Sequence, residues 1–178
     1  MRSSRSRIAT AVDRCRALAG TVAIPLCASL VLAACAARPP AAGPRSAQEL
    51  AVGYTAAWCS QQPERVASYY APNGSLQINA GAIAHGRQAI AAAAHGFMAA
   101  FPDLVVRMDG LDVHGNQALY RWTLTGHNTG PGGTGRAVTI SGYEEWTIGA
   151  DGLVAASLGH FDSADYDRQI NGGSAAPR

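Results

Sequence analysis

Leu153-Val-Ala-Ala-Ser-Leu-Gly-His-Phe-Asp162 is the last predicted strand of this chain, and the rest of the fold is interpreted around it. Successive side chains of a strand point to opposite faces of its sheet. On that rule five alternate residues share one face: Val154, Ala156, Leu158, His160 and Asp162. We expect this face to line a pocket. His160 and Asp162 would then form an ionisable pair in an apolar setting, where pKa values shift most strongly. The alternative is that the strand ends at His160 and that Asp162 reaches water.

The elements before this strand change from helical to extended periodicity. Apolar residues recur with the helical period over residues 46–61 and 86–101, and Pro63 opens a second, short helix. After Pro102 the period becomes 2, which predicts strands over 104–113, 117–126 and 136–148. A short helix or tail is expected over 163–170.

Helices followed by an antiparallel meander predict an α+β fold. We expect a cone-shaped roll or barrel, in which about three helices pack on the concave face of one strongly curved antiparallel sheet. Gly110, Gly142 and Gly159 interrupt the predicted strands and favour that curvature. The mouth of such a cone is a pocket.

Composition narrows the chemistry that is open to the chain. All 14 basic residues are arginine, so Schiff-base catalysis, a lysine general base and a phosphate-binding loop lysine are excluded. The formal net charge is +2, but from Cys35 onward 9 basic residues face 11 acidic ones, which gives −2. A mildly acidic domain without a basic cluster predicts no nucleic-acid partner.

The N-terminal region has the pattern of an export signal. Five arginines precede residues 17–37, which carry no charge, and Leu32-Ala-Ala-Cys35 looks like a bacterial lipobox. We predict that residues 1–34 are a signal peptide and that Cys35 is lipidated, which anchors the exported protein to the bacterial cell membrane. The alternative is an uncleaved membrane span. Residues 35–45 are rich in proline and alanine and are predicted to form a tether, residues 46–170 the domain, and residues 171–178 a disordered tail.

Five short motifs of the second half resemble those of the SnoaL-like polyketide cyclases, within the nuclear-transport-factor-2-like superfamily. They are Phe101-Pro-Asp-Leu104, Arg121-Trp-Thr-Leu-Thr-Gly126, Gly135-Arg136, Ser141-Gly142 and Gly159-His-Phe-Asp162. With the helical first half, the resemblance covers about residues 46–170. It implies a cone-shaped α+β barrel, a pocket between helices and sheet, and dimerisation through the sheet. It also implies that Asp162 acts as general acid/base in ring closure, assisted by His160.

Further side chains are candidates for the pocket lining. They are six aromatic residues and one acid: Tyr54, Trp58, Tyr69, Phe97, Trp122, Trp146 and Glu144. The aromatic residues would be equally ordinary in a core. Glu144 shares a strand face with Trp146, although a solvent-facing glutamate is the alternative. The histidines show no metal-ligand spacing, so we expect no metal and no other cofactor.

Two classes of function stay open. The first is an enzyme of the cyclase, isomerase, lyase or hydrolase type, in which Asp162 and His160 act on an apolar small molecule. The second is a lipoprotein without catalysis that binds an apolar small molecule or a partner protein on the same scaffold. Burial of Asp162 discriminates between them, because an enclosed carboxyl favours proton transfer.

Overall fold

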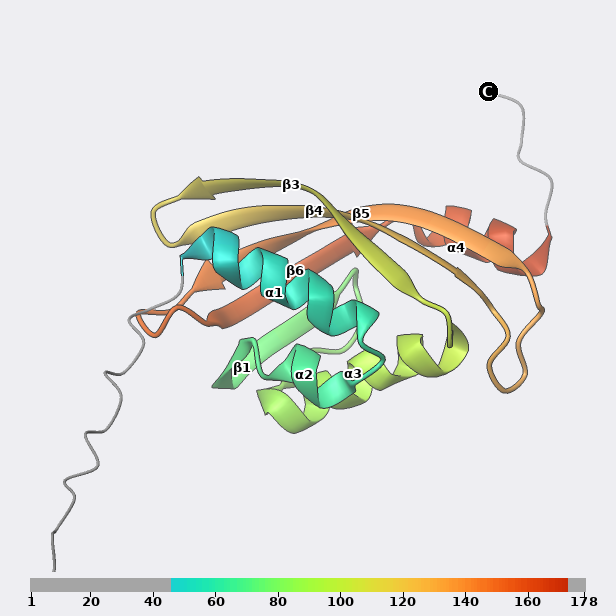
Figure 1. Ribbon diagram of the computed structural model, residues 1–178, viewed down its shortest axis with the longest axis horizontal. Coiled ribbons are helices and arrows are strands. Elements are labelled where there is room, and N and C mark those ends of the chain that lie inside the picture. The colour runs from blue at the N-terminus through green and yellow to red at the C-terminus, as the bar shows by residue number, and fades with distance from the viewer. Residues whose placement is uncertain (1–45, 173–178) are drawn as a thin grey trace, which may run out of the picture. The chain divides into compact units, whose positions relative to one another are not determined.

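The computed structural model describes residues 46–172 (Figure 1). The signal peptide, the lipidated Cys35 and the tether predicted for residues 1–45 lie outside the described residues, as do residues 173–178 of the predicted tail. In the described part of the chain, every helix is too short or too polar to span a membrane.

The described domain consists of helices and strands in an order close to the predicted one. They are α1 (Ala47–Cys59), α2 (Pro63–Ala67), β1 (Tyr70–Ile78), β2 (Ala84–His85), α3 (Gly86–Ala100), β3 (Val105–His114), β4 (Gln117–His127), β5 (Ala137–Ile148), β6 (Val154–Phe161) and α4 (Ser163–Asn171). The long helices and the last four strands begin and end within two residues of their predicted limits. Asn171, which was predicted to start the tail, is instead the last residue of α4.

Helix α1 begins at a capping box formed by Ser46 and Glu49. The Glu49 amide donates to Ser46 Oγ over 3.2 Å, and the Ser46 amide donates to Glu49 Oε2 over 2.9 Å. The helix then buries an apolar stripe that includes Tyr54 and Trp58. Figure 1 shows α1, α2 and α3 on one face of the sheet. The cap therefore fixes where α1 starts, and the apolar stripe fixes which side of α1 faces the sheet.

The six strands form one sheet in the order β2-β1-β6-β5-β4-β3. Every neighbouring pair is antiparallel except β1 and β6, which are parallel. The α+β prediction is confirmed, while the sheet is mixed rather than wholly antiparallel. The parallel pair arises because the chain leaves β1, forms α3 and the β3–β5 meander, and then returns beside β1 in the same direction.

One extra residue in β6 exchanges the two faces of that strand. Thr147 of β5 pairs with Ala156 while Ile148 pairs with Val154, so Ala155 bulges out of the register. Val154 is buried, and beyond the bulge the inward side chains are the odd-numbered ones, beginning with Ser157, which is 1% exposed. The prediction that Val154 and His160 share a face is therefore wrong, because a shift of one residue moves every following side chain to the other face.

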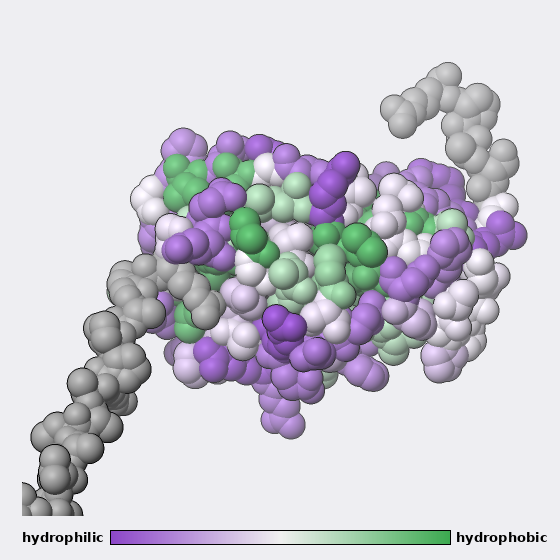
Figure 2. Space-filling model, viewed as in Figure 1, coloured by the Kyte–Doolittle hydropathy of each residue, from purple (hydrophilic) through white to green (hydrophobic). Residues whose placement is uncertain are grey.

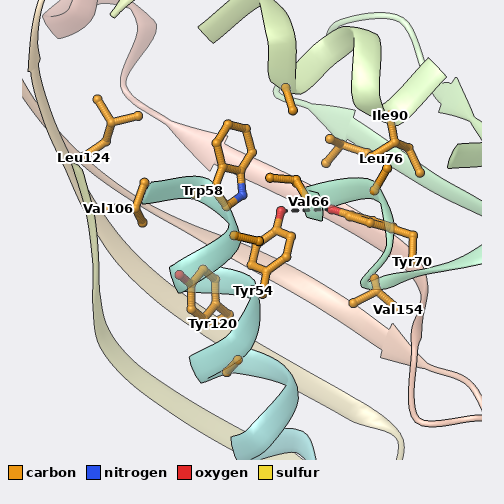
Figure 3. Close-up of a cluster of buried hydrophobic side chains, with 14 of the residues drawn as sticks. Tyr54, Trp58, Val66, Tyr70, Leu76, Ile90, Val106, Tyr120, Leu124 and Val154 are labelled. Carbon is orange, nitrogen blue, oxygen red and sulfur yellow. Dashed lines mark hydrogen bonds between the residues drawn. The ribbon is translucent and has the colours of Figure 1, made fainter. Parts of the chain in front are cut away.

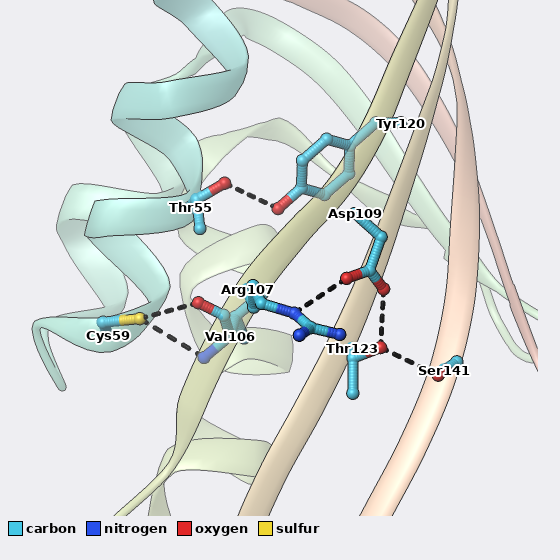
Figure 4. A network of polar contacts seen from close by, with 8 residues as sticks. All are labelled: Thr55, Cys59, Val106, Arg107, Asp109, Tyr120, Thr123 and Ser141. Atoms are coloured by element: carbon cyan, nitrogen blue, oxygen red, sulfur yellow. Dashed lines mark hydrogen bonds and ion pairs between the residues drawn. The ribbon is translucent and has the colours of Figure 1, made fainter.

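The outer face of the sheet carries a row of polar contacts across three strands. Arg107 Nε donates to Asp109 over 2.9 Å, Thr123 Oγ1 donates to the same carboxylate, and the Thr123 and Ser141 hydroxyls lie 2.8 Å apart (Figure 4). On the face that carries α1, Figure 2 shows apolar patches surrounded by polar side chains. The apolar core lies between the helices and the inner face of the sheet.

Candidate functional site

A cavity lies between the inner face of the sheet and helices α1 and α3. About 50 Å³ of the cavity is open to the centre of a water-sized molecule. Five of the predicted lining residues contribute to its wall: Tyr54, Trp58, Phe97, Trp122 and Glu144. Figure 3 shows Tyr54 and Trp58 of α1 facing Val106, Leu124 and Tyr120 of the sheet, all of which also line the cavity. The wall is mainly apolar. Among the described residues that line it, Glu144 is the only acidic one.

The remaining two predicted lining residues lie behind the wall. Tyr69 packs edge-on against Tyr54, with the ring centroids 6.2 Å apart. Trp146 is fully buried and stacks on Tyr120, with the centroids 4.7 Å apart and the planes at 13°. Both rings therefore support residues that face the cavity and do not face it themselves.

The Glu144 carboxylate is held by hydrogen bonds from three elements. Ser157 Oγ donates over 2.6 Å and Trp146 Nε1 over 2.8 Å to Oε2, and the Tyr54 hydroxyl lies 3.1 Å and 3.2 Å from the two oxygens. Glu144 is only 6% exposed. Because an ionised carboxylate has about four acceptor positions, these three donors fix its orientation and leave capacity for one more hydrogen bond.

A second tyrosine extends this hydrogen-bonded chain. The Tyr54 and Tyr70 hydroxyls lie 3.0 Å apart in the core (Figure 3). A hydroxyl has one hydrogen. When Tyr54 donates that hydrogen to Glu144, Tyr70 is the donor to Tyr54. Both hydroxyl hydrogens then point along the chain from Tyr70 to Tyr54 to Glu144.

Burial governs the electrostatics of this cluster. Removal from water raises the pKa of Glu144, and the hydrogen bonds that its carboxylate accepts, from Ser157 first and then from Trp146 and Tyr54, lower it by a smaller amount. Burial also raises the pKa values of Tyr54 and Tyr70, and the neighbouring Glu144 charge raises them further. The tyrosines are therefore neutral donors at ordinary pH, and Glu144 is a carboxyl group that retains its proton more readily than usual.

Three residues of β6 near Glu144 were missed by the sequence analysis. Gly159 lies directly opposite Glu144 in the β5–β6 register and lines the cavity, as does Phe161. Ser157 also lies on this inward face of β6, and it supplies the shortest hydrogen bond to Glu144. Their position could have been found only with knowledge of the bulge at Ala155.

One further polar atom at the cavity lacks a hydrogen-bond partner in the described chain. Trp122 lines the cavity, and its Nε1 is buried without an acceptor among residues 46–172. Buried indole N–H groups usually find a partner. Glu144 thus offers an acceptor at this mainly apolar wall, and Trp122 offers a donor that no described residue satisfies.

His160, expected at the pocket, lies on the outer face of the sheet. It pairs with Tyr143 across β5 and β6, and the two rings stack with centroids 4.7 Å apart. His160 Nε2 is 3.5 Å from Glu145 Oε1, and the side chain is 37% exposed. The inward neighbours of His160, Gly159 and Phe161, line the cavity in its place.

Asp162 is placed at a helix end. It is the exposed N-cap of α4, and its Oδ1 accepts a hydrogen bond of 2.9 Å from the Asp165 amide. This is an ordinary capping role for aspartate. His160 and Asp162 therefore do not meet at the pocket as expected. Because Asp162 is exposed, its environment does not favour an enzyme that uses Asp162 for proton transfer.

The described residues form a small α+β protein, whose fold matches that of a nuclear-transport-factor-2-like protein from Burkholderia pseudomallei K96243. Its curved sheet and helices enclose a pocket with one buried carboxyl group. A family model for the SnoaL-like domain matches residues 51–157, and the chain belongs to this family. Among curated proteins, none matches the sequence.

Solved structures show the same fold at low sequence identity. A putative SnoaL-like polyketide cyclase from Jannaschia sp. CCS1 is 21% identical with a TM-score of 0.63, and the match covers 75% of this chain and 98% of that one. TsrD from Streptomyces laurentii is 26% identical with a TM-score of 0.61 and coverages of 69% and 92%. AclR, a putative hydroxylase from Streptomyces galilaeus, is 18% identical with a TM-score of 0.62 and coverages of 74% and 84%.

Proposed function

We propose that the cavity binds a small, mainly apolar molecule and that Glu144 acts on it as a general acid/base. The reaction class is that of a cyclase, isomerase or lyase that moves one proton at a carbon next to a carbonyl group. The observation that supports this most strongly is the Glu144 carboxyl group, which is buried at the cavity wall with a raised pKa. In this proposal Glu144 takes the role that the resemblance assigned to Asp162 and His160.

The chemistry follows from the surroundings of the carboxylate. A base of raised pKa binds an abstracted proton more tightly, which favours proton transfer from a weakly acidic C–H group. The C–H bond breaks, its electron pair forms a carbon–carbon double bond, and the carbonyl π electrons move to oxygen. The proton stays on Glu144 and is then returned to another carbon or to the same one. Ser157 and Trp146 keep the carboxylate in place through these steps.

The second candidate is a binding protein without catalysis. It is favoured by a specific observation, namely that three protein donors already satisfy most of the Glu144 acceptor capacity. A carboxylate held in this way can be a structural element of the core. In that case the cavity would take up the apolar molecule, and Glu144 would only contribute one polar contact.

Deuterium incorporation into a simple ketone separates the two candidates. We would incubate the protein with 2-tetralone in D₂O and follow loss of the α-proton signals by NMR, because this step needs only a positioned base. The expected result is exchange faster than in buffer, reduced by on the order of 10²-fold in Glu144→Gln with binding of 2-tetralone retained. Binding with equal exchange in wild type and Glu144→Gln would reject Glu144 as the base.

A further inference from the structure

The indole N–H of Trp122 is a hydrogen-bond donor without an acceptor in the described part of the protein. Within residues 46–172, Nε1 is buried and unpaired, and the residue lines the cavity beside Tyr120 and Leu124 of the same strand. Indole nitrogen can only donate. A buried donor that lacks an acceptor is unfavourable, so its retention at a cavity wall calls for an acceptor that the described residues do not supply.

Trp122 and Glu144 are neighbours on the inner face of the sheet. Trp122 pairs with Gly142, and Tyr120 pairs with Glu144, so the two side chains occupy diagonal positions on β4 and β5. The Cβ atoms of such diagonal pairs are about 7 Å apart. One small ligand in the cavity would therefore lie near both side chains.

Gly142 determines where the Trp122 ring lies. A Cβ atom at Gly142 would come within 2.5 Å of Trp122 Cζ2, so the ring occupies the space that a side chain would need. The Trp122 ring of β4 thus packs directly over the backbone of Gly142 in β5. The missing side chain at Gly142 leaves room for the ring, whereas Glu144 is held by hydrogen bonds from Ser157 and Trp146.

We propose that Trp122 Nε1 donates a hydrogen bond to the oxygen of a bound carbonyl compound, and that this bond selects the ligand. The proposal rests on the proposed function, because it places the acidic C–H of the same ligand at Glu144. When that proton leaves, negative charge develops on the carbonyl oxygen, and a fixed donor there stabilises the charge. Trp122 is therefore a specificity-determining residue whose donor also assists proton removal.

The test compares a ketone with the hydrocarbon of the same shape. Equilibrium dialysis would give the affinities of 2-tetralone and tetralin for the wild type, Trp122→Phe, Glu144→Gln and Trp58→Phe. We expect the wild type to prefer the ketone by roughly tenfold, the ratio of one neutral hydrogen bond. Trp122→Phe should lose this preference, while Glu144→Gln and the control Trp58→Phe, which removes another cavity indole, should keep it.

Indole NMR signals report the bond directly. The chain has 3 tryptophans, so its ¹H–¹⁵N spectrum holds three indole signals, and the one missing in Trp122→Phe belongs to Trp122. Addition of 2-tetralone should move this signal downfield, and tetralin should not.

These measurements need no turnover, so they separate this proposal from the proposed function. A ketone preference that disappears in Trp122→Phe supports the donor even where deuterium exchange fails. A preference that survives in Trp122→Phe, or an unmoved Trp122 signal at saturating 2-tetralone, would overturn it. Absence of binding by both compounds to the wild type would overturn this proposal and the proposed function together.

Discussion

Glu144 and Gly159 lie directly opposite each other on β5 and β6. A Cβ atom added to Gly159 would be 3.6 Å from Glu144 Cγ and 3.9 Å from Ile78 Cγ1, which are ordinary contact distances. The absence of a side chain at Gly159 is therefore not needed for close packing. It leaves space in the cavity beside the carboxylate, where a ligand would have to lie for Glu144 to reach it.

Substitution of Gly159 by alanine should fill that space without disturbing the fold. We expect Gly159→Ala to keep the thermal stability of the wild type and to weaken binding of 2-tetralone, because the new methyl group lies between the ligand and Glu144. The affinity is measured by equilibrium dialysis and the stability by thermal unfolding.

Gly96→Ala is the matched control for this change. Gly96 is exposed on α3, and a Cβ atom at this position would meet no other atom within 4 Å. Alanine should therefore stabilise the helix by about 0.5–1 kcal/mol and leave binding unaltered. Unchanged affinity in Gly159→Ala would show that the ligand does not approach this part of the cavity.

The stability of the fold should depend on the ionisation of Glu144. Burial raises the folded-state pKa of this group above its unfolded value, which is about 4.3 for glutamate. The folded state then binds the proton more tightly, so the contribution of Glu144 is most favourable below about pH 4 and is lost as pH rises through the raised pKa. Relative to Glu144→Gln, the wild type should therefore lose stability between acidic and neutral pH.

Urea unfolding of both proteins over that pH range measures this difference. Other titrating groups are common to the two proteins, so their effects largely cancel. A wild type that instead gains stability over Glu144→Gln as pH rises would mean that the hydrogen bonds from Ser157 and Trp146 outweigh burial.

Asp162 should matter for α4 and not for the cavity. Because its carboxylate caps the helix, Asp162→Ala should cost about 0.5–2 kcal/mol, whereas Asp162→Asn should cost little, since asparagine caps equally well. Deuterium exchange into 2-tetralone should be the same in Asp162→Asn as in the wild type. A large loss of exchange in Asp162→Asn at unchanged stability would restore the catalytic role that the resemblance implies.

The membrane anchor is a prediction from the sequence of the N-terminal region. Leu32-Ala-Ala-Cys35 supports the proposal that residues 1–34 are removed and that Cys35 carries lipid. Replacement of Cys35 by alanine should then release the protein from the membrane fraction of bacterial cells. A Cys35→Ala product that stays in the membrane fraction at full precursor mass would support the uncleaved span.

The order of helices and strands could be predicted because it depends on local periodicity. The helical stripe around Tyr54 and Trp58 and the strand alternation of Trp122 and Trp146 are both present in the structure. The parallel pairing of β1 with β6 could not be predicted, because strand periodicity does not specify a partner.

The site was harder to predict, since the identity of the inward face depends on one bulged residue. Ala155 carries no sequence signal that distinguishes a bulge from a regular strand position, yet it moves His160 outward and Ser157 inward. Glu144 could be found because it shares one face of a regular strand with Trp146. Its hydrogen-bond donors Tyr54 and Ser157 come from distant parts of the chain, and no local pattern brings them together.

The base that we propose, Glu144, is a buried carboxyl group of raised pKa. This proposal is tested most directly by following the ¹³C signal of the Glu144 carboxyl group and the rate of deuterium exchange into 2-tetralone over one pH series. We predict that both change with the same midpoint, above the ordinary glutamate value of about 4.3, and that exchange is faster on the ionised side. A carboxyl signal that titrates at or below that value, or an exchange rate that does not follow it, would contradict the account.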